Sequence, residues 1–474
     1  ARKKGIIKPT SLPLIFGTAA GGIALPVIVA ASLAMPKRYE SSQIDWNRVA
    51  SIPVQDKGRI KPLDTVARHL LKTFAEPIFG MTPTIKDKEG NKYSPSQWFL
   101  SVLAGKPWTV DAEIFRVYNQ SAKNFLELDP SREDSRYSYR EIIPKMEDLS
   151  LEIQEIRKRP SEEWSFRDQK LVDVYGKINL YFGISQSYRD PMPAFAADNL
   201  NSTEDLQAFA EAFRRARFQA QELQQGNPPA LIPPPGEATK ENLASAKWQA
   251  YGPAIMDQRI EVISKGDDFE ENEAVNTLAE ILAKYQVDDV LETNKAIKKH
   301  VRLLEDMPLA ATQMSGSAAE AWLNRFSPIV QGVALYIFAI TLGLIGLLLR
   351  NNTAIRMTTS WMIVGVLVIH SIAIIARIYI SGKAPVVNLY SASIFIGWVT
   401  VVVSLVMEYI YKIGIANLVG ALIGACTLSV AGFLDTNDTM AVLQAVLDTQ
   451  SWLSTHVVTV TAGYGVTYLA GFLG

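Results

Sequence analysis

The sequence predicts an all-α polytopic membrane protein with about six transmembrane helices and a large, mostly helical extracytoplasmic domain. Charged residues make up only 20% of the 474 residues, and most of them lie in the middle of the chain. A membrane-spanning helix needs about 20 predominantly apolar residues. Six segments meet this requirement: residues 12–35, 327–349, 359–380, 391–411, 416–434 and 453–474.

These segments divide the chain into three predicted regions. Residues 1–37 form an amino-terminal transmembrane anchor, residues 38–325 a soluble insert, and residues 326–474 a five-helix membrane domain. The insert is long enough for one large domain or two smaller ones. The helices of the membrane domain are expected to pack as a bundle, because the spacing of Gly420 and Gly424 allows another helix to approach closely.

Basic residues near the helix ends predict the orientation, because cytoplasmic loops carry an excess of lysine and arginine. Arg2, Lys3, Lys4 and Lys8 precede the first span. The amino terminus is therefore expected in the cytoplasm, with a lipid bilayer around the spans. The insert is expected outside the cytoplasm.

The first apolar segment has an alternative interpretation as a cleaved signal peptide, because a basic start precedes an apolar stretch. The stretch is long and lacks a convincing cleavage site with small residues. These features favour an uncleaved anchor.

Apolar residues at three- and four-residue spacing predict that the insert is mostly helical. A proline- and glycine-rich stretch at residues 226–236 predicts a linker or an exposed loop, and a boundary between two subdomains is expected there. The predicted helices cover residues 59–76, 109–128, 140–158, 203–224, 240–264 and 286–306.

Several classes of chemistry find no support in the sequence. The single cysteine, Cys426, lies in an apolar segment, where a small residue in a packed helix is the simplest interpretation. There is no Cys-x-x-Cys-His motif, so the chain is not itself a c-type cytochrome. There is also no phosphate-binding glycine loop, no His-Glu-x-x-His motif and no basic stripe suited to nucleic acid, which is not an expected partner.

The four histidines differ in their surroundings. His69 and His300 lie on charged helices of the insert, where His69 is expected at the surface or in ordinary packing and His300 in solvent. His370 lies near the middle of a predicted span, where an ionisable residue is costly and marks a possible functional site. A neutral His370 that hydrogen-bonds to a neighbouring helix is an equal alternative.

His456 lies at the mouth of the last predicted span. It shares one helical face with Thr459, Gly463 and Thr467, and Tyr464 is adjacent to that face. In lipid, such a small and polar face is expected to turn inward, toward partner helices or a cavity. It suits a heme pocket, and it suits plain helix packing equally well.

Three stretches resemble known sequences. Residues 377–391 contain Pro385-Val386-Val387-Asn388-Leu389-Tyr390, and residues 443–456 contain Trp452-Leu453-Ser454-Thr455-His456. Both are similar to the CcsA (ResC-like) family of cytochrome c biogenesis proteins. Residues 52–68 resemble the start of the soluble part in long, fused members of that family.

The resemblance implies a function in cytochrome c maturation. In that family, the histidine matching His456 is an external axial ligand of heme b, which is the transported substrate. The heme vinyl groups then meet the reduced thiols of an apocytochrome c, and thioether bonds form. His370 is the second ligand candidate, while Asn388, Tyr390, Trp452 and Tyr464 are candidates for the pocket or vestibule. No catalytic residue is assigned, and no metal other than heme iron is expected.

The sequence departs from the family in one respect. The tryptophan-rich heme segment and the second external histidine do not occur in these 474 residues. The resemblance implies that they follow residue 474, or that a ResB-like partner or another chain supplies them. A second class of function therefore stays open, in which the chain is a non-catalytic membrane subunit whose insert docks partner proteins.

Glu408 and Lys412 are four residues apart near the predicted inner end of a span. This spacing predicts an ion pair between them.

Overall fold

The computed structural model contains two compact units, which are described separately here. The membrane unit comprises residues up to 36 and from 322 onward, and the insert unit comprises residues 37–77 and 81–321. The structure describes residues 12–77, 81–87, 89–192, 203–236, 246–265, 269, 271–349, 352–435, 438–440 and 451–474, without the side chains of 12–16, 312, 313, 315 and 451–454.

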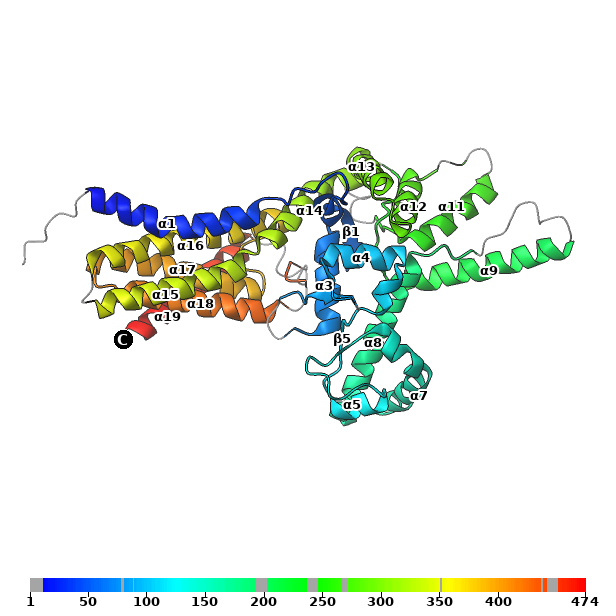
Figure 1. Ribbon diagram of the computed structural model, residues 1–474, viewed down its shortest axis with the longest axis horizontal. Helices are drawn as coiled ribbons and strands as arrows, with labels where there is room; N and C mark the ends of the chain where they lie inside the picture. The colour runs from blue at the N-terminus through cyan, green and yellow to red at the C-terminus, as the bar shows by residue number, and fades with distance from the viewer. Residues whose placement is uncertain are drawn as a thin grey trace, which may run out of the picture. The chain divides into compact units, whose positions relative to one another are not determined.

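The membrane unit is a bundle of long apolar helices (Figure 1). Six helices in the described residues are long and apolar enough to cross a membrane, which indicates an integral membrane protein. They overlap the six predicted spans, but the second candidate span runs on from Pro308 and the third begins at Thr353 instead of residue 359. The six helices are α1 (Leu12–Ala34), α15 (Pro328–Leu348), α16 (Thr353–Ser381), α17 (Leu389–Tyr411), α18 (Ile415–Leu434) and α19 (Ser451–Leu473).

Small residues set the helix packing in this unit. A methyl group added at Gly424 would lie 3.0 Å from the Val401 side chain and 3.1 Å from the Tyr336 ring. A methyl group at Gly420 would overlap the Ser404 hydroxyl. Helix α18 therefore packs against both α15 and α17 through its glycines, and the predicted close approach at Gly420 and Gly424 is confirmed.

The helix directions place the insert's two connections at one end of the bundle. Helices α1 and α16 run parallel, because Gly22 packs on Thr358 and Pro26 packs on Gly365 further along both helices. Helix α15 runs antiparallel to α16, to which it is joined by residues 349–352. The end of α1 and the start of α15 therefore lie at the same end of the bundle (Figure 1).

The insert unit is mostly helical, as predicted, and its large apolar core includes Trp98, Phe74, Phe115 and Tyr137. Helix α14 (Pro308–Phe326) leads from this unit to α15. The other helices are α2 (Trp46–Ser51), α3 (Leu63–Ala75), α4 (Pro95–Ala104), η1 (Pro107–Val110), α5 (Gln120–Phe125), α6 (Tyr139–Ile142), η2 (Ile143–Lys145), α7 (Met146–Arg157), η3 (Ser161–Glu163), α8 (Phe166–Ser187), α9 (Thr203–Gln225), α11 (Tyr251–Lys265), α12 (Glu273–Gln286) and α13 (Val290–Asp306).

Three short antiparallel hairpins interrupt the helices. In the first, Lys57 and Gly58 both have positive φ angles, of 51° and 78°, which is the geometry of a two-residue hairpin turn. The prediction of a helix from residue 59 is therefore wrong for residues 59–62. The pairs are β1 (Pro53–Asp56) with β2 (Arg59–Pro62), β3 (Ile85–Lys86) with β4 (Lys92–Tyr93), and β5 (Phe115–Arg116) with β6 (Arg136–Tyr137).

The proline-rich stretch near residue 230 is not an exposed loop. Ala230, Leu231 and Ile232 are buried, and backbone bridges join Ala230 to Gln55 and Ile232 to Gln249. Extended backbone within this stretch therefore pairs with β1 and with the segment before Tyr251, which satisfies its buried polar groups.

Other predicted helices of the insert differ in their outcomes. Helix α9 confirms the prediction for 203–224, and α13 confirms most of that for 286–306. The prediction for 109–128 is wrong, because only α5 and the end of η1 are helical there. Helix α11 begins at Tyr251, and residues 240–245 lie outside the described residues.

Candidate functional site

His370 is buried in the membrane unit, where it is 2% exposed. Its Nε2 lies 3.0 Å from the backbone carbonyl oxygen of Ile394 on α17. Its Nδ1 lies 3.3 Å from the hydroxyl oxygen of Tyr336 on α15. Because a carbonyl only accepts, Nε2 carries the proton and Nδ1 accepts from the tyrosine. Both ring nitrogens are therefore occupied, as in the alternative of a neutral histidine that links neighbouring helices.

His456 has the opposite surroundings. It lies in the second turn of α19, and its side chain is exposed. No described residue hydrogen-bonds to its ring, which leaves the coordinating nitrogens accessible. Thr459, Gly463 and Thr467 on the same face are also exposed. The expectation that this face turns into the bundle is therefore wrong for the described part of the chain.

A different face of α19 packs against the bundle. Thr461 and Leu469 are buried, at 6% and 2% exposure, and Gly465 lies midway between them on the same face. The Thr400 hydroxyl donates to the Gly465 carbonyl oxygen at 3.0 Å. A methyl group at Gly465 would lie 3.2 Å from the Val399 side chain. Because Gly465 has no side chain, α17 can approach α19 closely at this point. This contact determines which face of α19 is buried.

Two of the predicted vestibule residues meet at the end of α16. Asn388 Nδ2 donates to the Thr439 carbonyl oxygen at 2.8 Å. Arg377 donates to the same oxygen at 2.9 Å and to the Thr439 hydroxyl at 3.1 Å. The Arg377 guanidinium also lies 4.5 Å from the centre of the Tyr390 ring. We call Arg377, Asn388, Tyr390 and Thr439 the mouth cluster.

The mouth cluster fixes the start of α17. Asn388 caps this helix by accepting from the Ser391 backbone N–H at 2.9 Å, and the Ser391 hydroxyl accepts from the Asn388 N–H at 3.0 Å. A single planar guanidinium thus holds a loop carbonyl and an aromatic face together. Sequence analysis identified Asn388 and Tyr390 but missed Thr439, because its contact depends on how α18 and α19 are connected.

The mouth cluster and His456 belong to the same end of the bundle. Helix α16 ends and α17 begins at this end, and α19 runs from it toward the opposite end, where the chain finishes (Figure 1). The two histidines, in contrast, do not share a pocket: His370 is enclosed by α15 and α17, whereas His456 is exposed on α19.

The remaining candidate residues are either exposed or outside the described residues. Tyr464 is 56% exposed, on the outer side of α19. The side chain of Trp452 and residues 443–447 lie outside the described residues. Cys426 is exposed rather than packed inside the bundle. Within the described residues, no group of three His, Cys, Asp or Glu side chains is placed to hold a metal ion.

The predicted ion pair between Glu408 and Lys412 is wrong. Glu408 is 4% exposed, and its carboxylate lies 3.5 Å from Arg356 Nε. Its two oxygens accept from the Gly414 backbone N–H at 3.1 and 2.9 Å. The chain turns back at Lys412, whose φ of 58° ends the helix, so the carboxylate binds the turn instead of the lysine side chain.

Comparison with known proteins gives no relative: no family model matches the sequence, and no curated protein is significantly similar to it.

Proposed function

We propose that this protein holds heme at the extracytoplasmic side of a membrane and presents it for covalent attachment to apocytochrome c. The observation that carries the proposal is the exposed imidazole of His456, which has no hydrogen-bond partner among the described residues and lies near the start of a helix long and apolar enough to span a membrane. Gly463, two turns further along the same face, has no atom within 4 Å of where a side chain would begin. A flat macrocycle needs such an open face next to its ligand.

His456 fits the role of an axial ligand better than His370 does. A histidine that binds iron needs a free ring nitrogen. The His456 ring has no hydrogen-bond partner among the described residues, whereas the Nδ1 of His370 accepts from Tyr336 and its Nε2 donates to Ile394. We therefore assign His456 the heme-binding role and His370 the role of joining α15, α16 and α17.

The mouth cluster supports the proposal as a rigid border of the site. Arg377 and Asn388 hold the Thr439 carbonyl from two directions, which fixes the loop ends next to the membrane surface. Rigid surroundings lower the entropy cost of binding a planar ligand. Apocytochrome c and a partner chain with the tryptophan-rich segment, such as a ResB-like protein, would complete the assembly under this proposal.

Titration of the full-length protein with hemin in detergent tests the ligand assignment. We expect His456→Ala to weaken hemin binding by about tenfold or more and to change the Soret band, because an axial imidazole is lost. His69→Ala, in the insert unit, is the control and should leave both unchanged. Equal affinity and equal spectra for wild type and His456→Ala would contradict the assignment.

His370→Ala separates the two histidines. Under our assignment this variant melts at a lower temperature, because the Tyr336 hydroxyl and the Ile394 carbonyl lose their shared partner inside the bundle, yet it keeps the hemin spectrum of the wild type. Loss of the spectrum with unchanged stability would instead make His370 a ligand.

A second candidate function is a non-catalytic membrane subunit. The outer face of α19 favours it, because Tyr464, Val466 and Tyr468 are 56%, 48% and 53% exposed and could contact another transmembrane protein as well as lipid. Absence of hemin binding in the wild type, together with stable association with another membrane protein, would support this candidate.

A further inference from the structure

One face of α13 in the insert unit is strongly cationic. Lys295, Lys298, Lys299 and Arg302 are spaced by three or four residues, so they lie on one side of the helix. All four side chains are exposed, while Ile297 and other residues of the opposite face are buried in the core. The charges are therefore presented outward by a helix whose position is fixed.

A second group of cations is held beside this helix by the segment that follows α1. Asn294 on α13 donates to the Gln43 carbonyl at 2.9 Å and accepts from the Asp45 backbone N–H at 3.0 Å. Asn47 donates to the Lys37 carbonyl at 2.7 Å. The two bonds of Asn294 hold residues 43–45 against α13, and the bond between Asn47 and Lys37 folds the start of the segment back onto them.

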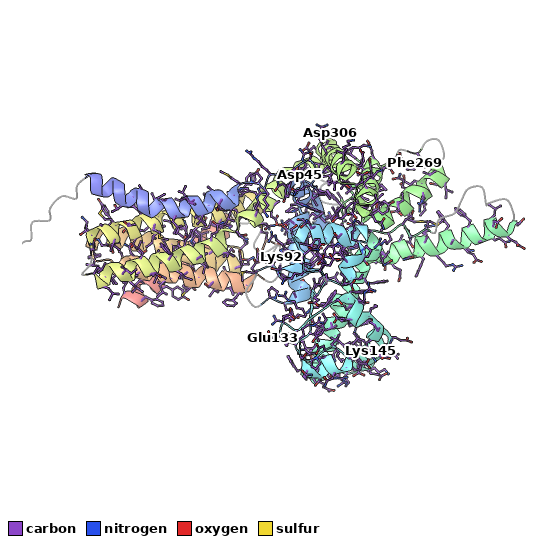
Figure 2. All side chains as sticks on the ribbon, in the orientation of Figure 1. Asp45, Lys92, Glu133, Lys145, Phe269 and Asp306 are labelled. Atoms are coloured by element: carbon purple, nitrogen blue, oxygen red, sulfur yellow. The ribbon has the colours of Figure 1, made fainter. Side chains whose placement is uncertain are left out.

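The two groups form one continuous surface, which we call the basic surface. Two adjoining pockets of about 520 and 380 Å³ share Lys298 as a lining residue. Asp45 and Asp306, which line one pocket each, are labelled in Figure 2. Seven cations against four carboxylates give these pockets a net charge of +3, the cations being Lys37, Arg38, Arg48, Lys295, Lys298, Lys299 and Arg302.

Four of these cations lack a carboxylate partner among the described residues: Lys37, Arg38, Lys298 and Arg302. The other three are paired. Arg48 binds Asp45 at 2.9 Å, Lys295 binds Glu292 at 2.7 Å, and Lys299 lies 3.7 Å from Glu273. The unpaired charges need counter-ions, which an anionic partner would replace.

The sequence position of this surface identifies the partner. Lys37 is only three residues beyond Ala34, the last residue of α1. An extended chain advances at most about 3.6 Å per residue, so Lys37 lies within about 11 Å of the end of that span. The polar headgroup region is about 5–8 Å thick on each side of the hydrocarbon. The side chains of Lys37 and Arg38 can therefore reach the lipid phosphates.

We propose that the basic surface binds the phosphate headgroups of anionic phospholipids. The lipid is favoured over an acidic protein because the chain itself tethers the surface to the bilayer, where anionic headgroups are present at high local concentration. Bound headgroups would hold α13 and the segment 37–48 at the membrane. The proposal is independent of heme binding and requires only that α1 spans the bilayer.

Lipid retention by the full-length protein tests this proposal. The protein is purified in mixed micelles of phosphatidylcholine and phosphatidylglycerol, washed with detergent, and its bound lipids are counted by native mass spectrometry. We expect retention of phosphatidylglycerol over phosphatidylcholine. In a variant with Lys37→Gln, Arg38→Gln, Lys298→Gln and Arg302→Gln, phosphatidylglycerol retention should fall by about tenfold or more, because each cation near a membrane surface contributes about fivefold.

The matched control carries the same loss of four charges elsewhere in the insert unit. Lys158→Gln, Arg214→Gln, Arg217→Gln and Lys265→Gln change exposed side chains and should leave retention unchanged. Inorganic phosphate at 20 mM, as a free-anion competitor, should displace little of the lipid (about twofold or less), because a free phosphate is not anchored in the bilayer.

Two outcomes would overturn the proposal. Equal retention in the wild type and the basic-surface variant would show that the lipid binds elsewhere. Complete displacement by inorganic phosphate would show a free-anion site instead of a lipid site. Circular dichroism of both variants checks that a loss of retention does not come from unfolding.

Discussion

His300 lies on α13 with its side chain fully buried between α13 and α12. Its Nδ1 lies 2.8 Å from the Thr277 hydroxyl on α12, while its Nε2 has no hydrogen-bond partner among the described residues. The neighbours Lys298 and Lys299 are exposed. The lysines suggested solvent from the sequence, but helical geometry turns residue 300 away from them, onto the same face as Ile297 and Leu304.

This histidine predicts a pH dependence of stability. Burial lowers the pKa of His300 to about 4, against about 6.5 in an unfolded chain. The unfolded state therefore binds a proton that the folded state does not, and stability is lost as pH falls from about 6.5 toward 4. The loss amounts to about 3 kcal/mol at most.

Hydrogen exchange of α12 and α13 in the full-length protein, followed from pH 7 to pH 5, measures this effect. We expect His300→Met to remove most of the acid-induced increase in exchange, since an apolar side chain of similar length does not titrate. His69→Gln is the control and should keep the increase. An unchanged pH profile in His300→Met would assign the acid sensitivity to other groups.

Single residues of the candidate site could be predicted from the sequence, but most of their contacts could not. Residue type and spacing identified His456, Asn388 and Tyr390 as candidates. They did not predict that Asn388 and Arg377 share the Thr439 carbonyl, or that Arg377 lies over the Tyr390 ring. They also did not predict that Glu408 pairs with Arg356. These contacts join residues far apart in sequence, and the turn after α17 decides the last one.

At the scale of helices, α1 is a packed member of the bundle and not a lone anchor. A methyl group added at Gly22 would lie 2.5 Å from the Thr358 carbonyl oxygen and 2.9 Å from the Met362 backbone nitrogen. Backbone atoms cannot move aside as a flexible side chain can. Gly21, the neighbouring residue, has no atom within 4 Å and faces away from α16.

This pair of glycines gives a matched test of the packing. We expect Gly22→Leu to destabilise the contact between α1 and α16 by about 1–3 kcal/mol, because overpacking forces the helices apart. Gly21→Leu should have little effect. The melting temperatures of the two variants in detergent measure the difference. Equal melting temperatures would mean that α1 does not pack on α16 through this face.

Helix prediction succeeded where one physical signal was strong. Long apolar segments predicted all six candidate spans, because spanning helices need length and hydrophobicity more than any tertiary contact. In the insert, α8 and α12 were missed and residues 59–62 were misassigned. The Lys57-Gly58 turn was the overlooked signal there, since glycine readily adopts a positive φ angle.

Helical spacing of small and polar residues did not predict which face of α19 packs inward. Two faces of this helix carry small and polar residues, one with Gly463 and one with Gly465. The sequence alone gave no reason to choose between them. The choice comes from α17, whose Thr400 hydroxyl and Val399 side chain fit against Gly465.

For the whole molecule, the helix directions bring several separate features to one end of the membrane bundle. The two connections to the insert, the mouth cluster and the start of α19 with His456 all belong to this end (Figure 1). In our proposal, this end faces away from the cytoplasm and is where heme is held.

The most direct test of this account is the reduced-minus-oxidised absorption spectrum of the full-length protein as purified from cells that make heme. We predict a b-type heme spectrum in the wild type that is lost or strongly reduced in His456→Ala and retained in His69→Ala. A wild-type protein without any heme absorption, or a His456→Ala variant with the full wild-type spectrum, would contradict the account.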